Sequence, residues 1–478
     1  MTAKGFSSLL LTRRRALIGL TGAAIAGVAG RARVQAAPAP GVVAPLGLSD
    51  EEGPEIILKI AGDDGAAKTF IPEIARNYLL YRGASGVVIS DADRPWTTQV
   101  TGTMLNGLQV AILIRASSSA DGFTQLAGGN ADVGLSTRMA RPNEVPGFDG
   151  LTMAEAARNI RAIALNAVEL IVNKATGIEA LSVDDCLGIF QGKIRDWSAV
   201  GGNPGPIRRY GRPIDYGSNN LLGASLANNP VLSGLRVVQS YAEMLKSVAE
   251  DPQSIGYIAA NNSYRDPKKW RGAVVPVKFK HDGRLTAMPD EYGIATGDYP
   301  LVFPILLYRV PGQDNLEVDS FFAQAESVQS DVIVLQSGFI AGTPQLLVPP
   351  RFDDGAPSRY AQLTRNGLRV STTVRFDPGS VKVDSRTKRG LDALANYLRR
   401  LDVAPEQLRH LVFSEETGTA ERNAEVSASL GEVFGRELRA RDVRIGQVIP
   451  FGAEHALASS NSPLGQWLNR RVETWVIP

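Results

Sequence analysis

The sequence predicts an α/β protein built on mostly parallel sheets, with a smaller α/β domain at its C-terminal end. Three observations lead to this prediction. Short apolar runs alternate with helix-period segments through the body of the chain, as expected when strands and helices follow one another. The 478 residues, 44% of them hydrophobic, suffice for more than one core. A stretch rich in Pro and Asp, residues 348–357, separates the body from the tail.

The N-terminal segment indicates export to the periplasm. Residues 13–15 are all arginine, and they precede a weakly apolar run at 18–28 and small residues as far as Ala36. This pattern is typical of a signal peptide, and the arginines make it similar to a twin-arginine signal. Because the run is shorter than the roughly 20 residues of a membrane-spanning helix, we expect cleavage near Ala36 rather than a permanent anchor. Ala16 replaces the phenylalanine of the twin-arginine consensus, so the general secretory route stays open.

Shifts in composition divide the chain into five stretches. They are a signal peptide at 1–36, a linker at 37–54, a body at 55–343, a second linker at 344–362 and a tail at 363–478. The signal contains six basic residues and no acid, so its removal changes the formal net charge from +2 to −4. A mildly acidic chain lacks the basic footprint of nucleic-acid binding, and we expect no nucleic-acid partner. The single cysteine, Cys186, has apolar neighbours and is expected to be buried.

Periodicity gives the elements of the body. Strands are expected where apolar residues run without interruption, at 56–60, 110–114, 162–172 and 272–277. Helices are expected where apolar side chains recur at helical spacing, at 69–80, 184–190 and 241–249. In such sheets ligands bind beyond the carboxyl ends of the strands, at loops that open helices.

Three polar loops are candidates for a site that binds an anion or a small polar ligand. Helix-opening N–H groups, hydroxyls, amides and an arginine fork all suit oxyanions. The alternative is that the Ser and Asn residues only cap helices, since they are ordinary N-cap residues. The candidates are Asp63, Asp64 and Gly65 in the first loop, Ser117, Ser118, Ser119 and Gly122 in the second, and Arg212, Ser218 and Asn219 in the third.

Five segments of the body carry a further signal, and they are 128–138, 165–173, 189–202, 255–258 and 299–301. Together they resemble the phosphate-binding proteins of ABC importers, which are type II periplasmic binding proteins. The resemblance implies a two-lobed periplasmic-binding-protein fold that closes by a hinge on a ligand in the cleft. It adds Arg138 to the ligand-binding candidates. It also implies phosphate as a ligand and an ABC transporter permease as a partner.

The chain departs from that family in two of the three loops. Asp63 and Asp64 stand where the family has a Ser or Thr. The sites of that family tolerate one acid, which takes a proton from monobasic phosphate. Acids at a helix start stabilise the helix by roughly 0.3–1 kcal/mol each, but they oppose an incoming anion. The Ser-Gly-Thr loop of the family is Gly217-Ser218-Asn219 here. Phosphate, another small polar ligand, and a cleft that holds a protein instead of a ligand all stay open.

The tail alternates strand and helix, as a compact α/β module does. Strands are expected at 369–376, 408–413 and 471–477, and helices at 385–401 and 420–439. A second set of residues stands out in the tail: Phe376, Asp377, Val383, Gly418, Asn423, Val426, Ser427, Asn461, Gly465 and the block Asn469-Arg470-Arg471-Val472-Glu473. With these residues the tail resembles the OmpA-like peptidoglycan-associating domain, which implies peptidoglycan as a partner.

In that family an aspartate and an arginine bind diaminopimelate of the wall peptide. Aligned through Gly418 and Asn423, their positions are Glu415 and Leu430. A Glu can still receive an ammonium, whereas a Leu cannot pair with a carboxylate, and the loss of one charged partner typically costs about 2–5 kcal/mol. Arg470 is a candidate substitute, with a purely structural role as the alternative. The wall-peptide candidates are Glu415, Asn423 and Arg470.

No catalytic, cofactor or metal site is expected. The histidines at 281, 410 and 455 lie far apart, without a ligand or triad pattern around them, and no phosphate-loop or dinucleotide motif occurs. Two functions stay open. The chain is either a solute-binding protein that its tail holds near the cell wall, or a non-transport envelope protein with structural or assembly tasks and a degenerate cleft.

Overall fold

The computed structural model describes residues 53–141, 143–148, 151, 158–212, 234–262, 272–350 and 359–478. The chain divides into two units, Met1–Gly53 with Pro478, and Pro54–Ile477. The predicted signal peptide, nearly all of the first linker, and the candidates Ser218 and Asn219 lie outside the described residues.

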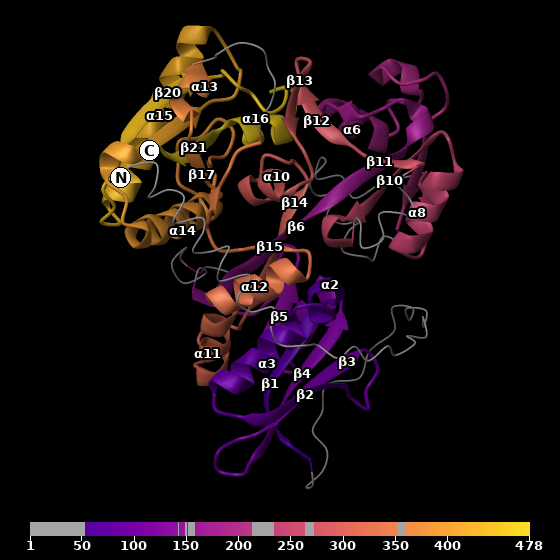
Figure 1. The fold of residues 1–478 in the computed structure, drawn as a ribbon, viewed down its shortest axis with the longest axis vertical. Helices are drawn as coiled ribbons and strands as arrows, with labels where there is room; N and C mark the ends of the chain where they lie inside the picture. Colours follow the sequence, from indigo (N-terminus) through magenta and orange to yellow (C-terminus); the bar gives the residue numbers. More distant parts are fainter. Residues whose placement is uncertain are drawn as a thin grey trace. The chain divides into compact units, whose positions relative to one another are not determined.

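Among the described residues, the body contains a twelve-stranded mixed sheet (Figure 1). Its first part, with the helices that cover it, is called lobe 1 and has the strand order β2-β3-β4-β1-β5-β14-β6. Strands β4, β1 and β5 are parallel neighbours, so their carboxyl ends meet at one edge. The bounds are β1 Glu55–Asp63, β2 Ser85–Asp91, β3 Thr97–Thr103, β4 Gln109–Ser117, β5 Val133–Ser136, β6 Ile160–Asn173, β14 Val302–Tyr308 and β15 Ile340–Ala341.

The helices of lobe 1 bury apolar faces against this sheet. Helix α3 has a proline in its first turn, which suits a helix start, and it buries Ile74, Tyr78 and Leu79. The ring of Tyr78 packs edge-on against Phe321 with centroids 5.6 Å apart. The bounds are α2 Asp64–Ala67, α3 Ile71–Tyr81, α4 Ser119–Ala127, α11 Leu316–Ala325 and α12 Val328–Gln336.

Strand β6 continues into the second part of the sheet, called lobe 2, where it pairs with β10 and β11. Strands β8 and β9 extend this part, and β7, β12 and β13 form a separate small sheet. The bounds are β7 Ala180–Leu181, β8 Arg208–Gly211, β9 Arg236–Val237, β10 Ser254–Ala259, β11 Val274–Pro276, β12 Lys278–His281, β13 Arg284–Ala287, α6 Val183–Phe190, α8 Tyr241–Glu250 and α10 Glu291–Thr296, with short 3-10 helices at Lys174–Thr176, Trp197–Val200 and Ala260–Asn262.

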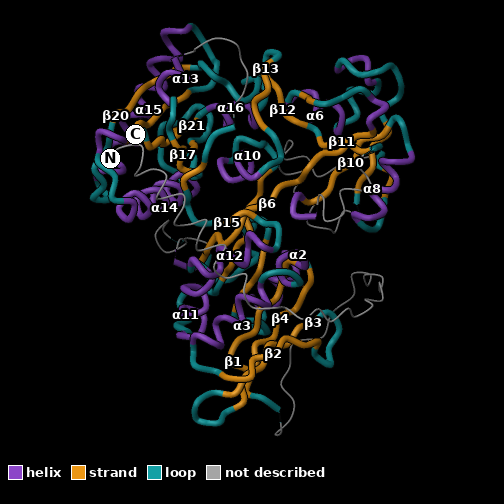
Figure 2. Tube along the Cα trace, in the orientation of Figure 1, coloured by secondary structure: helices purple, strands orange, loops and turns teal. Residues whose placement is uncertain are grey.

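The tail has its own sheet, in which β17, β20 and β21 are labelled in Figure 2. Its strand order is β16-β17-β21-β19-β20, with β18 beside β21. Strands β19 and β20 are parallel because helix α15 connects them. The bounds are β16 Leu346–Leu347, β17 Leu368–Val370, β18 Val374–Arg375, β19 Leu408–Phe413, β20 Gln447–Gly452, β21 Arg471–Val476, α13 Arg359–Thr364, α14 Ser385–Leu401, α15 Ala420–Arg439 and α16 Pro463–Asn469, with a 3-10 turn at Pro405–Gln407.

Two expectations about strands are wrong. The body sheet is mixed rather than mostly parallel, because the hairpin β2–β3 and the return strand β14 both pair antiparallel. The expected strand 369–376 is two short strands, since Ser371 turns away to bond Gln345. The Ser371 N–H donates to the Gln345 carbonyl at 2.8 Å, and the Gln345 N–H donates to Ser371 Oγ at 3.0 Å.

Two further features concern the described residues as a whole. Cys186 is fully buried, as expected, and burial raises the pKa of its thiol. In the described part of the chain, none of the helices combines the length and the apolarity needed to cross a membrane.

Candidate functional site

The carboxyl edge of β4, β1 and β5 gathers the lobe 1 candidates. In the parallel register Asp63 faces Ser117, and Gly62 faces Leu135 of β5. The first and second polar loops are therefore neighbours in space although 54 positions separate Asp63 from Ser117.

Two glycines make this edge sterically feasible. Gly62 has φ +143°, and a Cβ added there would lie 1.9 Å from the Leu135 carbonyl oxygen. A Cβ on Gly122 would lie 2.8 Å from the Ala61 carbonyl oxygen, so only glycine lets α4 approach β1 this closely. Gly122 therefore has a packing role at the edge.

Asp63 is the most perturbed group of the edge. It is half-buried and caps α2, where its Oδ1 accepts the Ala66 N–H at 3.1 Å. Burial, and next the charge of Asp64, raise the pKa of Asp63 to about 7. Asp64 is exposed, with Lys68 Nζ 3.5 Å from its Oδ2. Near neutral pH, Asp63 thus holds a proton about half the time and can donate a hydrogen bond.

The three serines hold the second loop in place. Ser118 caps α4 by accepting the Asp121 N–H at 3.2 Å. Ser119 Oγ accepts the Thr137 N–H at 3.1 Å and lies 3.2 Å from Thr137 Oγ1. Ser117 Oγ donates to the Gly62 carbonyl at 3.4 Å, a long hydrogen bond that a ligand can replace. Thr137, which the sequence analysis did not single out, follows β5 inside the segment 128–138.

The guanidinium groups of the two arginine candidates each contact other residues of the same lobe. Arg138 binds both oxygens of Glu144, at 2.6 and 2.7 Å, and stacks over the Phe123 ring. Arg212 donates to the Gln239 carbonyl at 3.1 Å and lies over the Tyr241 ring. Neither set of contacts could be predicted from the sequence, because Glu144 and Gln239 belong to loops without a motif.

The wall-peptide candidates of the tail meet one another. Arg470 Nη1 lies 2.6 Å from both oxygens of Glu415, and its Nη2 donates to the Ser380 carbonyl at 2.5 Å. Both side chains are buried, and Leu430 is fully buried as well. Asn423 is buried and accepts the Thr417 N–H at 3.3 Å. The acid and the base of this site therefore neutralise each other within the chain.

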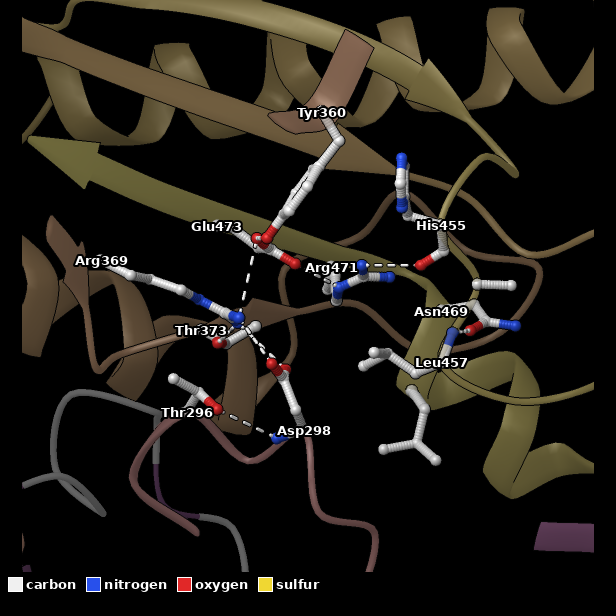
Figure 3. Close-up of polar contacts among 12 residues, drawn as sticks. Thr296, Asp298, Tyr360, Arg369, Thr373, His455, Leu457, Asn469, Arg471 and Glu473 are labelled. Carbon is white, nitrogen blue, oxygen red and sulfur yellow. Dashed lines mark hydrogen bonds and ion pairs between the residues drawn. The ribbon is translucent and has the colours of Figure 1, made fainter. Parts of the chain in front are cut away.

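A buried polar network surrounds the C-terminal motif and reaches the body (Figure 3). Arg471 donates to Glu473 Oε1 at 2.8 Å, and Tyr360 donates to Glu473 Oε2 at 2.8 Å. Burial opposes the charge of Glu473, but Arg369 and Arg471 outweigh it and lower its pKa to about 2. Arg369 also binds Asp298 of the body through two hydrogen bonds of 2.5 and 3.0 Å. Sequence analysis missed this contact because its partners are 71 residues apart.

The histidine in the core of the tail has a structural setting. His410 is fully buried, its Nδ1 lies 3.0 Å from Thr474 Oγ1, and burial lowers its pKa to about 4. Within the described ranges, no three His, Cys, Asp or Glu side chains are placed to share a metal ion.

With this geometry established, the body can be compared with known proteins. Residues 90–326 match the model of the PBP superfamily domain. This match covers just under half of the chain. The phosphate-binding protein PstS of Bacillus subtilis (strain 168) is 25% identical over 197 residues, which are 40% of this chain and 57% of that protein. The chain thus spans little more than half the length of this curated relative.

Solved structures are also similar. An ABC-type phosphate transport receptor from Vibrio cholerae has 19% identity and a TM-score of 0.45, over 59% of this chain and 99% of that one. The peptidoglycan-associated lipoprotein from Burkholderia pseudomallei has 25% identity and a TM-score of 0.20, over 22% of this chain and 88% of that one. The predicted α/β fold class is confirmed, because the described residues form mixed sheets covered by helices.

Proposed function

We propose that the chain is an exported solute-binding protein that captures a small polar ligand carrying an oxyanion, such as phosphate, at the carboxyl edge of lobe 1. The observation that carries this proposal is the pairing of Asp63 with Ser117 at the ends of adjacent parallel strands. Ligands of α/β sheets bind at such ends. The PBP-like domain at 90–326 supports the proposal.

The chemistry of the edge permits an anion despite its two acids. With a pKa of about 7, Asp63 presents a protonated carboxyl part of the time, which donates a hydrogen bond to an oxyanion. Ser117 has only one long hydrogen bond to give up. An ABC transporter permease would then be the partner that receives the ligand.

Calorimetry of the mature protein with phosphate and sulfate tests this proposal. We expect heat of binding for the wild type, and an affinity at least tenfold weaker in Ser117→Ala. Asp314→Asn, at an exposed position, is the matched control and should bind like the wild type. Native mass spectrometry tests for a retained ligand. No heat with either anion, together with no retained small molecule, would rule out the receptor function.

The tail favours a second candidate function. Glu415 and Arg470 satisfy each other, and Leu430 is buried, which opposes wall-peptide binding through these residues. The alternative is an envelope structural or assembly protein whose cleft and tail both serve protein contacts.

Binding to isolated peptidoglycan sacculi separates the two roles of the tail. Retention of the wild type, with loss in Glu415→Gln, supports wall association through Glu415. No retention of either protein supports the structural alternative. Glu415→Gln is preferable to Glu415→Ala, because an amide still fills the buried site and accepts hydrogen bonds from Arg470.

A further inference from the structure

The turn between β2 and β3 carries a tryptophan in an unusual backbone conformation. Trp96 has φ +59°, a left-handed conformation that is a genuine outlier for a bulky residue. Left-handed backbone costs free energy in any residue with a Cβ, and such outliers gather at functional sites. The position therefore calls for a physical reason beyond the making of a turn.

Hydrogen bonds place this turn at the ligand edge of lobe 1. The Ala116 N–H donates to the Trp96 carbonyl at 2.9 Å, and Ala116 directly precedes Ser117. The Thr97 N–H donates to the Arg94 carbonyl at 3.3 Å, which closes the turn. Because β3 runs antiparallel to β4, the beginning of β3 lies beside the end of β4. Trp96 is thus two strands away from Asp63, along the same edge.

The side chain of Trp96 lies outside the hydrophobic core. It is 37% exposed, whereas Trp197 and Trp475 are buried. Lys68 Nζ lies 5.1 Å from the centre of its ring and also 3.5 Å from Asp64 Oδ2. Lys68 therefore connects the tryptophan to the first polar loop. The indole N–H makes no hydrogen bond within the described ranges, so it is a donor available to a ligand.

A purely structural role explains these features poorly. An exposed cation–π contact contributes little, and it does not require a left-handed backbone. An aromatic wall beside a few fixed polar groups is, by contrast, the usual composition of a small-molecule site. A bare tetrahedral anion has no apolar face that could cover an indole ring.

We propose, resting on the proposed function, that Trp96 forms one wall of the ligand site and that the ligand is a phosphorylated sugar. The apolar face of a sugar ring packs on the indole, and the indole N–H donates to a ring substituent. The phosphate takes the Ser117 side of the edge. A hydroxyl of the sugar donates to the exposed carboxylate of Asp64, which gives a role to the second acid, one that a free anion would not need.

The test compares three probes, glucose 6-phosphate, glucose and inorganic phosphate, by calorimetry on the mature chain. We expect glucose 6-phosphate to bind at least tenfold more tightly than either other probe. Trp96→Gly removes the ring and tolerates positive φ, so the turn should stay folded. It should weaken glucose 6-phosphate at least tenfold and leave inorganic phosphate within twofold. Trp96→Phe should recover most of the lost affinity, because it restores an aromatic face.

Fluorescence adds a readout that a structural role would not move. Glucose 6-phosphate should change the tryptophan emission of the wild type and leave that of Trp96→Phe unchanged. Tyr81→Ala is the matched control, an aromatic that is 80% exposed at the far end of α3, and it should bind all probes like the wild type.

The outcomes separate this inference from the proposed function. If phosphate binds and glucose 6-phosphate binds no better, or if Trp96→Gly leaves its affinity unchanged, the inference is overturned while the receptor function stands. If glucose binds as tightly as glucose 6-phosphate, the phosphorylated class is wrong. If none of the probes binds, both the inference and the oxyanion receptor are overturned.

Discussion

Asp63 couples the candidate site to pH. Its pKa of about 7 arises from burial and from the adjacent Asp64, both of which disfavour its negative charge. The protonated carboxyl donates to an anion, whereas the carboxylate repels it. Binding of an anion should therefore weaken as the pH rises through 7.

Sulfate is the probe for this first prediction, because its charge is constant in this range while that of phosphate increases. We expect the sulfate Kd to rise roughly tenfold between pH 6 and pH 8, following the protonated fraction of Asp63. Asp63→Asn should bind sulfate equally at both pH values, since an amide donates at either. Calorimetry at the two pH values measures this. An unchanged pH dependence in Asp63→Asn would assign the titration to another group.

The same group affects stability. The pKa of Asp63 is higher in the folded chain than its ordinary value of 3.8, so the folded state binds more protons between about pH 4 and pH 7. The free energy of unfolding should accordingly fall as the pH rises through this window. Asp63→Asn should remove this loss and be more stable than the wild type at pH 8, on the order of 1–2 kcal/mol once partial exposure is allowed for.

Thermal unfolding at pH 4.5 and pH 8 measures this second prediction. The Tm of the wild type, relative to that of Asp63→Asn, should be higher at pH 4.5 than at pH 8. A variant less stable than the wild type at pH 8 would show that the charge-assisted hydrogen bond from Ala66 to the carboxylate outweighs the cost of burying the charge.

At the scale of elements, α4 fixes one side of the candidate site. Ser118 satisfies an N–H of its first turn, and Gly122 lets that turn pack against β1. Ser118→Ala should destabilise the protein by about 1 kcal/mol, the usual effect of losing an N-cap. Urea unfolding followed by circular dichroism measures it. Ser240→Ala, which removes the corresponding cap of α8, is a control. It should lower the free energy of unfolding by a similar amount without changing the affinity for the ligand.

Elements with strong periodicity could be predicted from sequence, and the others could not. The helices at 385–401 and 420–439 and the strand at 408–413 have the predicted bounds, because their apolar faces repeat regularly. Strand β2 was not predicted, because its side chains are largely exposed and show no clear alternation of apolar and polar residues. The hairpin that carries Trp96 was missed for this reason.

The candidate site shows the same division. That the Asp63 and Ser117 loops meet followed from parallel strands ending at one edge. The pairing of Arg470 with Glu415 could not be predicted, because their sequence separation of 55 residues leaves no local pattern. The raised pKa of Asp63 likewise depends on burial, which only the packed structure provides.

At the scale of the whole molecule, Asp298 joins the body to two arginines of the tail, Arg369 at 2.5 Å and Arg375 at 3.7 Å. Asp298 follows α10 and directly precedes Tyr299, whose hydroxyl donates to the Val168 carbonyl on β6 at 3.1 Å. Arg369 comes from β17 and binds both oxygens of Asp298 in a fully buried setting (Figure 3). Burial opposes the charge of Arg369, but Asp298 and Glu473 outweigh it and raise its pKa.

Breaking this pair from one side should be strongly destabilising. Asp298→Asn leaves Arg369 buried with one fewer charged partner. Arg369→Met likewise leaves Asp298 buried with one fewer charged partner. Each single variant should lose about 3–5 kcal/mol, the usual cost of an uncompensated buried charge. The double variant should lose clearly less than the sum of the two, because it removes both charges of the pair, while Glu473 and Arg375 each keep another charged neighbour or hydrogen bond. Denaturant unfolding of all four proteins gives the coupling free energy, and additive losses would show that the pair does not join tail and body energetically. Glu425→Gln breaks an exposed pair with Arg422, 67% exposed on both sides, and should change stability by less than about 1 kcal/mol.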